Sequence, residues 1–197
     1  MMVILDNGHG GMIGGNYQTL GKQYQFKDGT TIYEGEFNRA IKARVAELLT
    51  AKGIPYYDLV PENKDISLKE RIRRANAIHE QYKGKTFLIS IHADAGGGSG
   101  AGVFIAKQSS QKSLYYATWA RDLFSRHFPE SKHRGIKRRN FYVLRYSFMP
   151  AILLENFFMD NEQECKTYLL TQKGRDRIAW YIVDLIQNIL EHGDLVA

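Results

Sequence analysis

The stretch that decides the fold is residues 151–156, Ala-Ile-Leu-Leu-Glu-Asn, which directly follows Met149-Pro150. Four apolar residues in a row after a proline are typical of a short buried strand. The carboxylate of Glu155 then stands at the strand's end, where burying an unpaired charge is expensive. Taken alone, such a carboxylate most simply caps the next helix or pairs with a nearby cation.

Two other strand-like runs also end in chemically active side chains. Residues 3–5 (Val-Ile-Leu) lead into Asp-Asn-Gly-His at 6–9, and residues 87–91 (Phe-Leu-Ile-Ser-Ile) lead into His92. In open α/β sheets, sites form beyond the carboxyl ends of the strands. We therefore expect His9, His92 and Glu155 to meet at one edge of a sheet, in a pattern that favours a metal site.

Strands and amphipathic helices alternate along the chain. Helical spacing of apolar residues predicts helices at 34–52, from 65 or 67 to 82, at 113–128 and within 162–191; strands are expected at 2–5, 54–60, 86–91, 101–106, 141–144 and 151–155. The glycine-punctuated insertion 14–33 carries an Asp-Gly hairpin signal at 28–29, and the glycine-rich residues 93–100 are expected to form a mobile loop. The pattern predicts one α/β domain over 1–197, a mostly parallel or mixed twisted sheet of about six strands with helices on both faces.

The overall composition is that of an ordinary soluble globular protein, with 44% hydrophobic and 24% charged residues. Nowhere do about 18 apolar residues run together, so no membrane span is expected. The first residues lack the basic and apolar segments of a signal peptide. The single Cys165 excludes an internal disulfide and a cysteine-based zinc site, and its polar neighbours suggest an incidental thiol.

The net charge of +6, from 27 Lys plus Arg against 21 Asp plus Glu, favours an anionic polymer as partner. Much of the excess lies in residues 132–139, Lys-His-Arg-Gly-Ile-Lys-Arg-Arg. A charge run is more often a solvated surface, and this one lacks the aromatic or motif context of nucleic-acid binding. Composition alone does not decide between nucleic acid and an acidic cell wall; taken with the motifs below, no nucleic-acid partner is expected.

A zinc site can be assembled from His9, Glu34 and His92. Without cysteines, zinc binds histidine nitrogen and carboxylate oxygen, and a catalytic site uses three such ligands and keeps a fourth position open. Glu34 opens the predicted helix 34–52, where the helix dipole alone would also favour a carboxylate. One histidine at a strand end is usually structural, but two at equivalent ends, beside small residues, favour a metal. The other histidines (79, 127, 133 and 192) are interpreted as surface residues.

The chemistry of such a site needs a second carboxylate that does not bind the metal. Zinc lowers the pKa of bound water and polarises a carbonyl. A free carboxylate then accepts the proton of the water and passes it to a leaving amine. Glu155, held on a rigid strand, fits this role, and the pattern predicts metal-assisted hydrolysis of an amide.

At this point the sequence resembles the zinc-dependent N-acetylmuramoyl-L-alanine amidases of the Amidase_3 type, over nearly the whole chain. Four motifs in the right order carry the resemblance: residues 6–11 (Asp-Asn-Gly-His-Gly-Gly), Glu34 four residues before Asn38, residues 90–95 (Ser-Ile-His-Ala-Asp-Ala), and residues 149–155. The resemblance implies that His9, Glu34 (rather than Glu36) and His92 bind one zinc ion and that Glu155 is catalytic.

The chain departs from the family pattern in two places. Asn7 stands where the family usually has proline, and Asn156-Phe157-Phe158 replaces a frequent Thr-Gly-Phe. Bulky Phe157 in place of glycine is expected to reshape the substrate groove. The insertion 14–33 lies between two ligands and is expected to form one wall of the site.

The resemblance further implies cleavage of the amide between N-acetylmuramic acid and the L-alanine of the peptidoglycan stem peptide. Stem peptides carry carboxylates, so Arg134, Lys137 and Asn156 are candidate substrate contacts, with plain surface charge as the alternative. A zinc peptidase cutting within the stem, an inactive wall-binding module, and a nucleotide-binding protein using its glycine turns are the competing hypotheses. A chain without a signal peptide fits a phage or prophage lysin, or a domain excised from a secreted enzyme.

Overall fold

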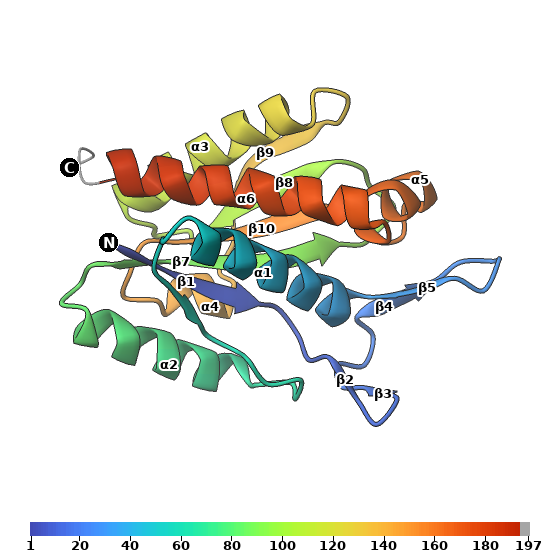
Figure 1. Ribbon diagram of the computed structural model, residues 1–197, viewed down its shortest axis with the longest axis horizontal. Coiled ribbons are helices and arrows are strands. Elements are labelled where there is room, and N and C mark those ends of the chain that lie inside the picture. Colours follow the sequence, from blue (N-terminus) through green and yellow to red (C-terminus); the bar gives the residue numbers. More distant parts are fainter. Residues whose placement is uncertain (194–197) are drawn as a thin grey trace.

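A six-stranded sheet forms the centre of the computed structural model, which describes residues 1–193 (Figure 1). The strand order is β6-β1-β7-β10-β8-β9, and every neighbouring pair runs parallel except β10 with β8, which is antiparallel. The strands are β1 (Met2–Asn7), β6 (Tyr56–Asp58), β7 (Thr86–Asp94), β8 (Ala101–Ile105), β9 (His133–Arg138) and β10 (Ala151–Phe158). The predicted mixed, mostly parallel sheet is confirmed.

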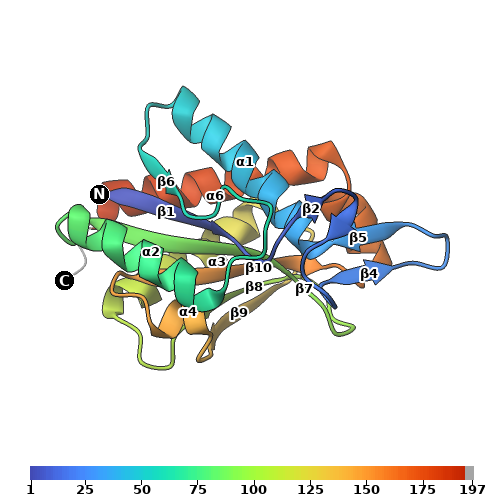
Figure 2. The same ribbon diagram turned by 90° about the horizontal axis from the view of Figure 1, so that it is seen from below.

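Helices cover both faces of this sheet, as expected. One face carries α1 (Glu34–Ala51), α3 (Gln111–His127) and α6 (Gln172–His192), and the other carries α2 (Leu68–Gln81) and the single turn α4 (Tyr142–Arg145). Figure 2 shows α1 and α6 above the strands and α2 and α4 below them. Because both faces are covered, the central strands are largely apolar in their amino-terminal halves.

The alternation of side chains along each strand divides the core into two parts. Leu5, Ile89 and Leu154 pack under α1, α3 and α6, whereas Ile4, Leu88 and Leu153 pack under α2 and α4. Successive residues of a strand point to opposite faces. The residues two positions beyond the second group are Asp6, Ser90 and Glu155, so their polar side chains lie on the α2 and α4 side at the carboxyl ends of the strands.

The segment 141–144, which we expected to be a strand, is helical instead. The backbone carbonyl of Phe141 accepts hydrogen bonds from the N–H groups of Leu144 and Arg145, closing one turn. Val143 and Leu144 are both buried, whereas Phe141 and Tyr142 remain exposed. Two adjacent buried residues do not alternate as a strand requires, and a single turn is too short to show helical periodicity.

The basic run 132–139, where a solvated surface is expected, mostly forms the edge strand β9, parallel to β8. Its side chains are mostly half-buried. Charged side chains on an edge strand hinder pairing with another chain. The strand lacks the apolar alternation by which strands are found in sequences, so the charge pattern hid it.

The glycine-rich loop after β7 is tethered, where we expected a mobile segment. Oδ2 of Asp160 accepts hydrogen bonds from the N–H groups of Gly96 and Gly97, at 2.7 and 2.8 Å, and a carboxylate oxygen of Glu164 accepts one from Gly100. The acidic side chains therefore hold the loop through its backbone.

Three smaller differences from the prediction concern the insertion 14–33, the last helix, and the burial of Cys165 and the remaining histidines. The insertion forms the expected hairpin β4 (Gln23–Gln25) with β5 (Thr31–Tyr33), and also a small ladder of β2 (Met12–Ile13) with β3 (Asn16–Tyr17). The final helical region is divided into α5 (Glu162–Glu164), a π-helical turn (Cys165–Leu169) and α6. Cys165 is buried in the core, and of the four histidines expected at the surface, His192 is exposed whereas His79, His127 and His133 are partly buried.

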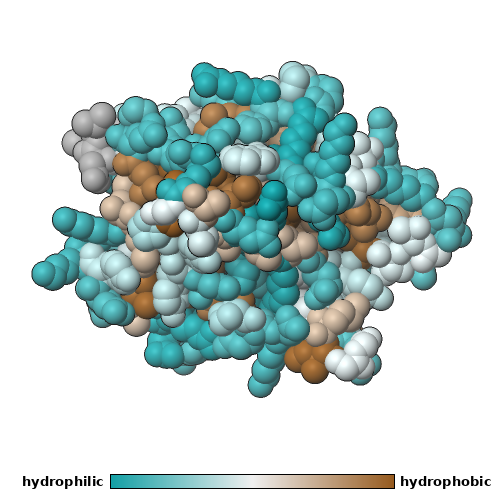
Figure 3. Space-filling view, in the orientation of Figure 1, coloured by the Kyte–Doolittle hydropathy of each residue, from teal (hydrophilic) through white to brown (hydrophobic). Residues whose placement is uncertain are grey.

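The molecular surface is mainly polar, as expected when the apolar side chains pack around a central sheet. The face shown in Figure 3 is mostly hydrophilic, with apolar side chains gathered in small patches. Within residues 1–193, no helix combines the length and apolar character that a membrane crossing requires. The predicted domain boundary at residue 197 lies outside the described residues.

Candidate active site

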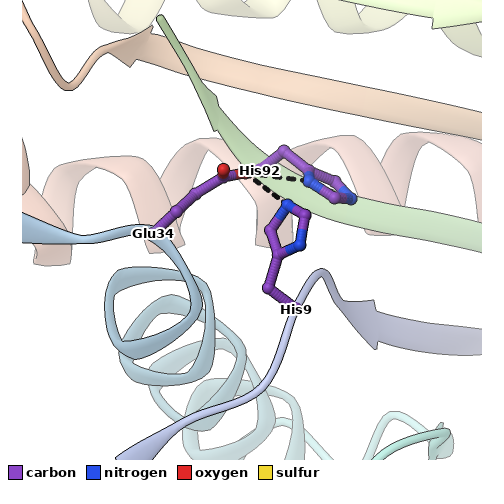
Figure 4. Close-up of side chains that lie close together, drawn as sticks. All are labelled: His9, Glu34 and His92. Atoms are coloured by element: carbon purple, nitrogen blue, oxygen red, sulfur yellow. Dashed lines mark hydrogen bonds and ion pairs between the residues drawn. The ribbon is translucent and has the colours of Figure 1, made fainter. Parts of the chain in front are cut away.

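Three side chains from separate elements meet where the strands end (Figure 4). His9 follows β1, Glu34 is the first residue of α1, and His92 belongs to β7. Oε1 of Glu34 lies 3.1 Å from Nε2 of His9 and 3.0 Å from Nδ1 of His92, and the potential ligand atoms of the three residues all lie within 4.8 Å of one another. The structure thus brings together the three residues proposed as zinc ligands.

The glycine turn after β1 gives the two histidine rings room to approach each other. A Cβ atom on Gly8 would lie 2.0 Å from Cε1 of His92, so only glycine fits there. His9 itself has a φ of +68°, a conformation that residues other than glycine rarely adopt. Its carbonyl accepts hydrogen bonds from the guanidinium groups of Arg39 and Arg71, both at 3.0 Å, and these contacts hold the unfavourable backbone.

Helix α1 docks directly on that turn and so places Glu34. A Cβ on Gly35 would lie 1.8 Å from the carbonyl oxygen of Gly10, and Nδ2 of Asn38 donates to the carbonyl of Gly8 at 3.0 Å. Glu34 is only 2% exposed. Burial alone would raise the pKa of Glu34, but hydrogen bonds from His9 and His92 outweigh it and hold that pKa well below its usual value. By contrast, Glu36 accepts a hydrogen bond from the N–H of Met12 and lies outside this cluster.

A buried chain of polar groups behind His92 fixes the orientation of its ring. The Ser90 hydroxyl donates to Oδ2 of Asp6 at 2.6 Å, so its oxygen accepts from Nε2–H of His92, 3.1 Å away. Arg71 donates to the other Asp6 oxygen at 2.6 Å. Burial alone would raise the pKa of Asp6, but Arg71 and Ser90 outweigh it and lower that pKa. Because Ser90 holds the proton on Nε2, a metal ion can replace the Nδ1 proton of His92 that Glu34 accepts in the metal-free site.

Glu155 lies beside this cluster without joining it. It stands on β10 opposite His92 on β7 in the sheet register, and it is partly buried. Its Oε2 has no hydrogen-bond partner among the described residues. Withdrawal from water raises the pKa of Glu155 to about 8, and the nearby His92 only partly opposes this effect. In the metal-free site, the carboxyl group of Glu155 therefore takes up a proton more readily than an exposed glutamate does.

The cluster opens into a cavity of about 560 Å³, a volume typical of small-molecule sites. Its lining includes Lys22 from the insertion, Leu68 and Arg71 from α2, and Phe141 and Tyr142 at α4. The expected contribution of the insertion to one wall is thus seen at Lys22. Sequence reasoning missed the other four as site residues, and only the basic character of Arg71 offered any signal.

The candidate substrate contacts lie outside this cavity in the described structure. Arg134 pairs with Asp94 at 2.7 Å and stacks on the ring of Phe158, and Lys137 lies over Phe104. Asn156 is buried and donates through Nδ2 to the carbonyl oxygen of His92 at 3.1 Å.

Phe157 does not reshape the groove as we expected. It has a φ of +64°, which turns its side chain away from the cavity, and it is fully buried. Its ring stacks on Tyr168 with centroids 4.2 Å apart and also contacts Phe124 and Phe128. The residue at this position is part of the core under α3 and α6, and the positive φ explains why glycine also suits it.

The donor set suits a zinc ion: two imidazole nitrogens and one carboxylate oxygen converge, and a fourth direction faces the cavity. A metal bound between three protein ligands, with an unligated carboxylate at its side, is typical of hydrolases that cleave amides. The fold and site thus define a candidate metallohydrolase built on a mixed α/β sheet.

The chain belongs to the N-acetylmuramoyl-L-alanine amidase family (Amidase_3), whose family model matches residues 3–188. This match confirms the resemblance found in the sequence motifs and assigns the chain to an amide-hydrolysing class of enzymes that act on peptidoglycan.

Individual relatives agree with this assignment. An N-acetylmuramoyl-L-alanine amidase from Clostridium difficile 630 superimposes with a TM-score of 0.80 at 28% identity, covering 96% of each chain. An uncharacterized cell wall amidase of Bacillus anthracis is 31% identical over 83% of this chain, which spans only 31% of that protein. The uncharacterized protein YqiI of Bacillus subtilis is 27% identical, covering 82% of this chain and 72% of its own length.

Proposed function

We propose that the protein hydrolyses the amide between N-acetylmuramic acid and L-alanine in peptidoglycan, with one zinc ion held by His9, Glu34 and His92. The observation that carries the proposal is the placement of Glu155 in register with His92, with no hydrogen-bond partner at its Oε2 within residues 1–193. The family membership supplies the substrate class.

In this mechanism each residue has one task. When bound, zinc supplies a Lewis acid that polarises the scissile carbonyl and makes a water molecule more acidic. Glu155 accepts a proton from the attacking water and later donates it to the departing nitrogen of L-alanine. Burial of Glu155 favours its protonated form, which is the form that donates to the departing nitrogen. Ser90 and Asp6 keep the His92 ring in place during both steps.

The candidate substrate contacts outside the cavity would bind the parts of a polymeric substrate that extend beyond the cavity. Arg134 and Lys137 lie on β9, and Arg134 pairs with Asp94, which lines the cavity. Both cations would meet carboxylates of stem peptides that extend beyond the cavity. Asn156 would act only indirectly, through the backbone carbonyl of His92.

Product analysis of digested peptidoglycan tests the proposal. Purified cell walls are incubated with the zinc-loaded protein, with the chelated protein, and with the chelated protein after zinc is restored. We expect new L-alanine amino termini without new reducing sugar ends, lost with the chelator and recovered with zinc. New amino termini at another stem residue would assign the protein to the zinc peptidases, and zinc binding without cleavage of any wall type would favour an inactive binding module.

The site of action follows from the same proposal, because peptidoglycan amidases work at the cell wall. Origin as a phage or prophage lysin, or as a domain of a longer secreted enzyme, stays a prediction. The native open reading frame decides between them, according to whether an export signal precedes residue 1.

A further inference from the structure

We propose that Lys22 makes the enzyme selective for stem peptides with a free α-carboxylate on the residue that follows L-alanine. The inference rests on the proposed amidase function and adds a specificity determinant to it.

The backbone around Lys22 is fixed against the metal site. Its carbonyl accepts a hydrogen bond from the N–H of Glu34 at 2.9 Å, and its own N–H donates to the carbonyl of Thr19 at 3.3 Å. The residue thus stands immediately before β4, beside the first turn of α1. Its side chain is 48% exposed, and its ammonium lies 3.8 Å from Oε2 of Glu34. Lys22 is therefore both anchored at its backbone and open to a ligand at its tip.

The charges around the cavity leave Lys22 as the cation available to a substrate. Among the described lining residues, the other cation is Arg71. Its guanidinium is 2% exposed and donates to Asp6 and to the carbonyl oxygens of Asn7, His9 and Ile66. These hydrogen bonds occupy the guanidinium nitrogens of Arg71 with acceptors inside the protein. Of these two described cations, Lys22 is therefore the one whose charged group a carboxylate entering the cavity can meet.

A bound metal ion would leave the ammonium of Lys22 more accessible to an anionic group of the substrate. Glu34 is the carboxylate nearest to Lys22, at a distance beyond that of a good hydrogen bond. Once Glu34 is committed to a dication, its negative charge is offset and its hold on the ammonium weakens. The positive charge of Lys22 is then free to attract an anionic group of the substrate, which supports a role in substrate recognition beyond neutralising Glu34.

The opposite wall of the cavity has a different chemistry, which orients the substrate. Phe141, Tyr142 and Leu68 line that wall and are all partly exposed. Figures 1 and 2 place α4 and the β4–β5 hairpin on either side of the carboxyl end of β1. The scissile amide joins a sugar to a peptide, so the two parts must leave the metal in different directions. Flat apolar rings suit the face of a sugar, and the ammonium suits a peptide carboxylate.

The test uses two synthetic muramoyl peptides that differ at one group. Both carry L-alanine on the lactyl group, and the residue after it ends in either an α-carboxylate or the α-carboxamide. We measure kcat and KM for the wild type, Lys22→Gln, Lys22→Arg and the control Lys27→Gln. Lys27 is an exposed lysine in the same hairpin, so its substitution makes the same charge change away from the cavity.

We expect the wild type and Lys27→Gln to prefer the carboxylate substrate by about tenfold in kcat/KM. Lys22→Gln should abolish this preference by raising KM for the carboxylate substrate, with little effect on the carboxamide, and Lys22→Arg should retain it. Isothermal titration with zinc-loaded Glu155→Gln, with and without Lys22→Gln, should show the same difference in Kd. All variants should contain one zinc per chain.

The inference is wrong if Lys22→Gln lowers both substrates equally, if the preference persists without Lys22, or if zinc is lost with it. If the wild type cleaves neither substrate, the proposed function itself is wrong and this inference falls with it. The two failures are distinguishable because the first set of outcomes requires an active amidase.

Discussion

The cavity has two halves that differ in how they are built. The inner half consists of side chains at the ends of β1, β7 and β10, fixed by the register of the sheet and, around His92, by the buried chain of Ser90, Asp6 and Arg71. The outer half consists of Lys22 from a hairpin and the aromatic residues at α4, which are partly exposed.

This difference separates two tasks. Reacting groups must be held within a fraction of an ångström, and buried strand ends provide that rigidity. Groups that select a substrate need only lie in its path, and loops can supply them without disturbing the core. We therefore expect substitutions in the inner half to affect catalysis, metal binding and stability, and those in the outer half to affect mainly the choice of substrate.

The largest effect is expected from Glu155→Gln in the inner half. The amide cannot accept the proton of water, so kcat should fall by about a thousandfold or more, whereas the zinc content should stay at one per chain. The control is Glu162→Gln, an exposed residue at α5 outside the cavity. A rate near that of the wild type would show that Glu155 is not the proton carrier.

Glu34 and Glu36 are two positions apart in the sequence, and the structure predicts different effects for their substitution. Glu34→Ala should lose zinc, because it removes the carboxylate that contacts both histidines. Glu36→Ala should keep zinc, because Glu36 only holds the N–H of Met12 in the outer loop. Metal analysis after dialysis measures both, and the reverse result would exchange their roles.

Two ion pairs allow the same comparison for stability. Arg71→Met leaves Asp6 buried without its cation and should cost about 3–5 kcal/mol in the free energy of unfolding. Asp28→Asn breaks the solvent-exposed pair with Lys166 and should leave the unfolding midpoint unchanged. Denaturant titration of both variants decides the point, and equal destabilisation would contradict the contrast between the buried support of the inner half and the exposed hairpin.

The smallest effect is a pH dependence in the metal-free protein. The pKa of Glu155 is raised to about 8 from an ordinary value of 4.5, so the folded state binds this proton more tightly than the unfolded state. The protonated carboxyl of Glu155 contributes fully to the free energy of unfolding below pH 4.5, and this contribution is lost as the pH rises through 8. Relative to the wild type, Glu155→Gln should therefore gain on the order of 3 kcal/mol between pH 5 and pH 9. Chelated samples unfolded across this range provide the measurement, and a constant difference would contradict it.

The inner half was largely predictable from the sequence, for a physical reason. A strand followed by a polar residue is a local pattern, and the rule that sites form at the carboxyl ends of strands joins distant segments without any knowledge of contacts. His9, His92 and Glu155 could be found in this way. Their supporting residues could not, because the contacts from Asp6 to Arg71 and to Ser90 join segments far apart in the sequence.

The outer half was mostly hidden for a different reason. The single turn α4 is too short for its periodicity to be read, and the charges of β9 mask its pairing with β8. Lys22 looks like any surface lysine until the backbone hydrogen bond to Glu34 places it at the cavity. Such positions are set by tertiary contacts, which local propensity does not encode.

The position of β10 in the sheet has a consequence for biosynthesis. This strand is the last of the six in the sequence, yet it lies between β7 and β8 and is the only described strand that joins β8 and β9 to the others. During translation, β8 and β9 cannot join the rest of the sheet until residues 151–158 have been synthesised, because these non-local pairings form late. The same strand delivers Glu155. A growing chain therefore contains His9, Glu34 and His92 before Glu155 has been synthesised. We expect hydrolytic activity to appear only when β10 completes the sheet.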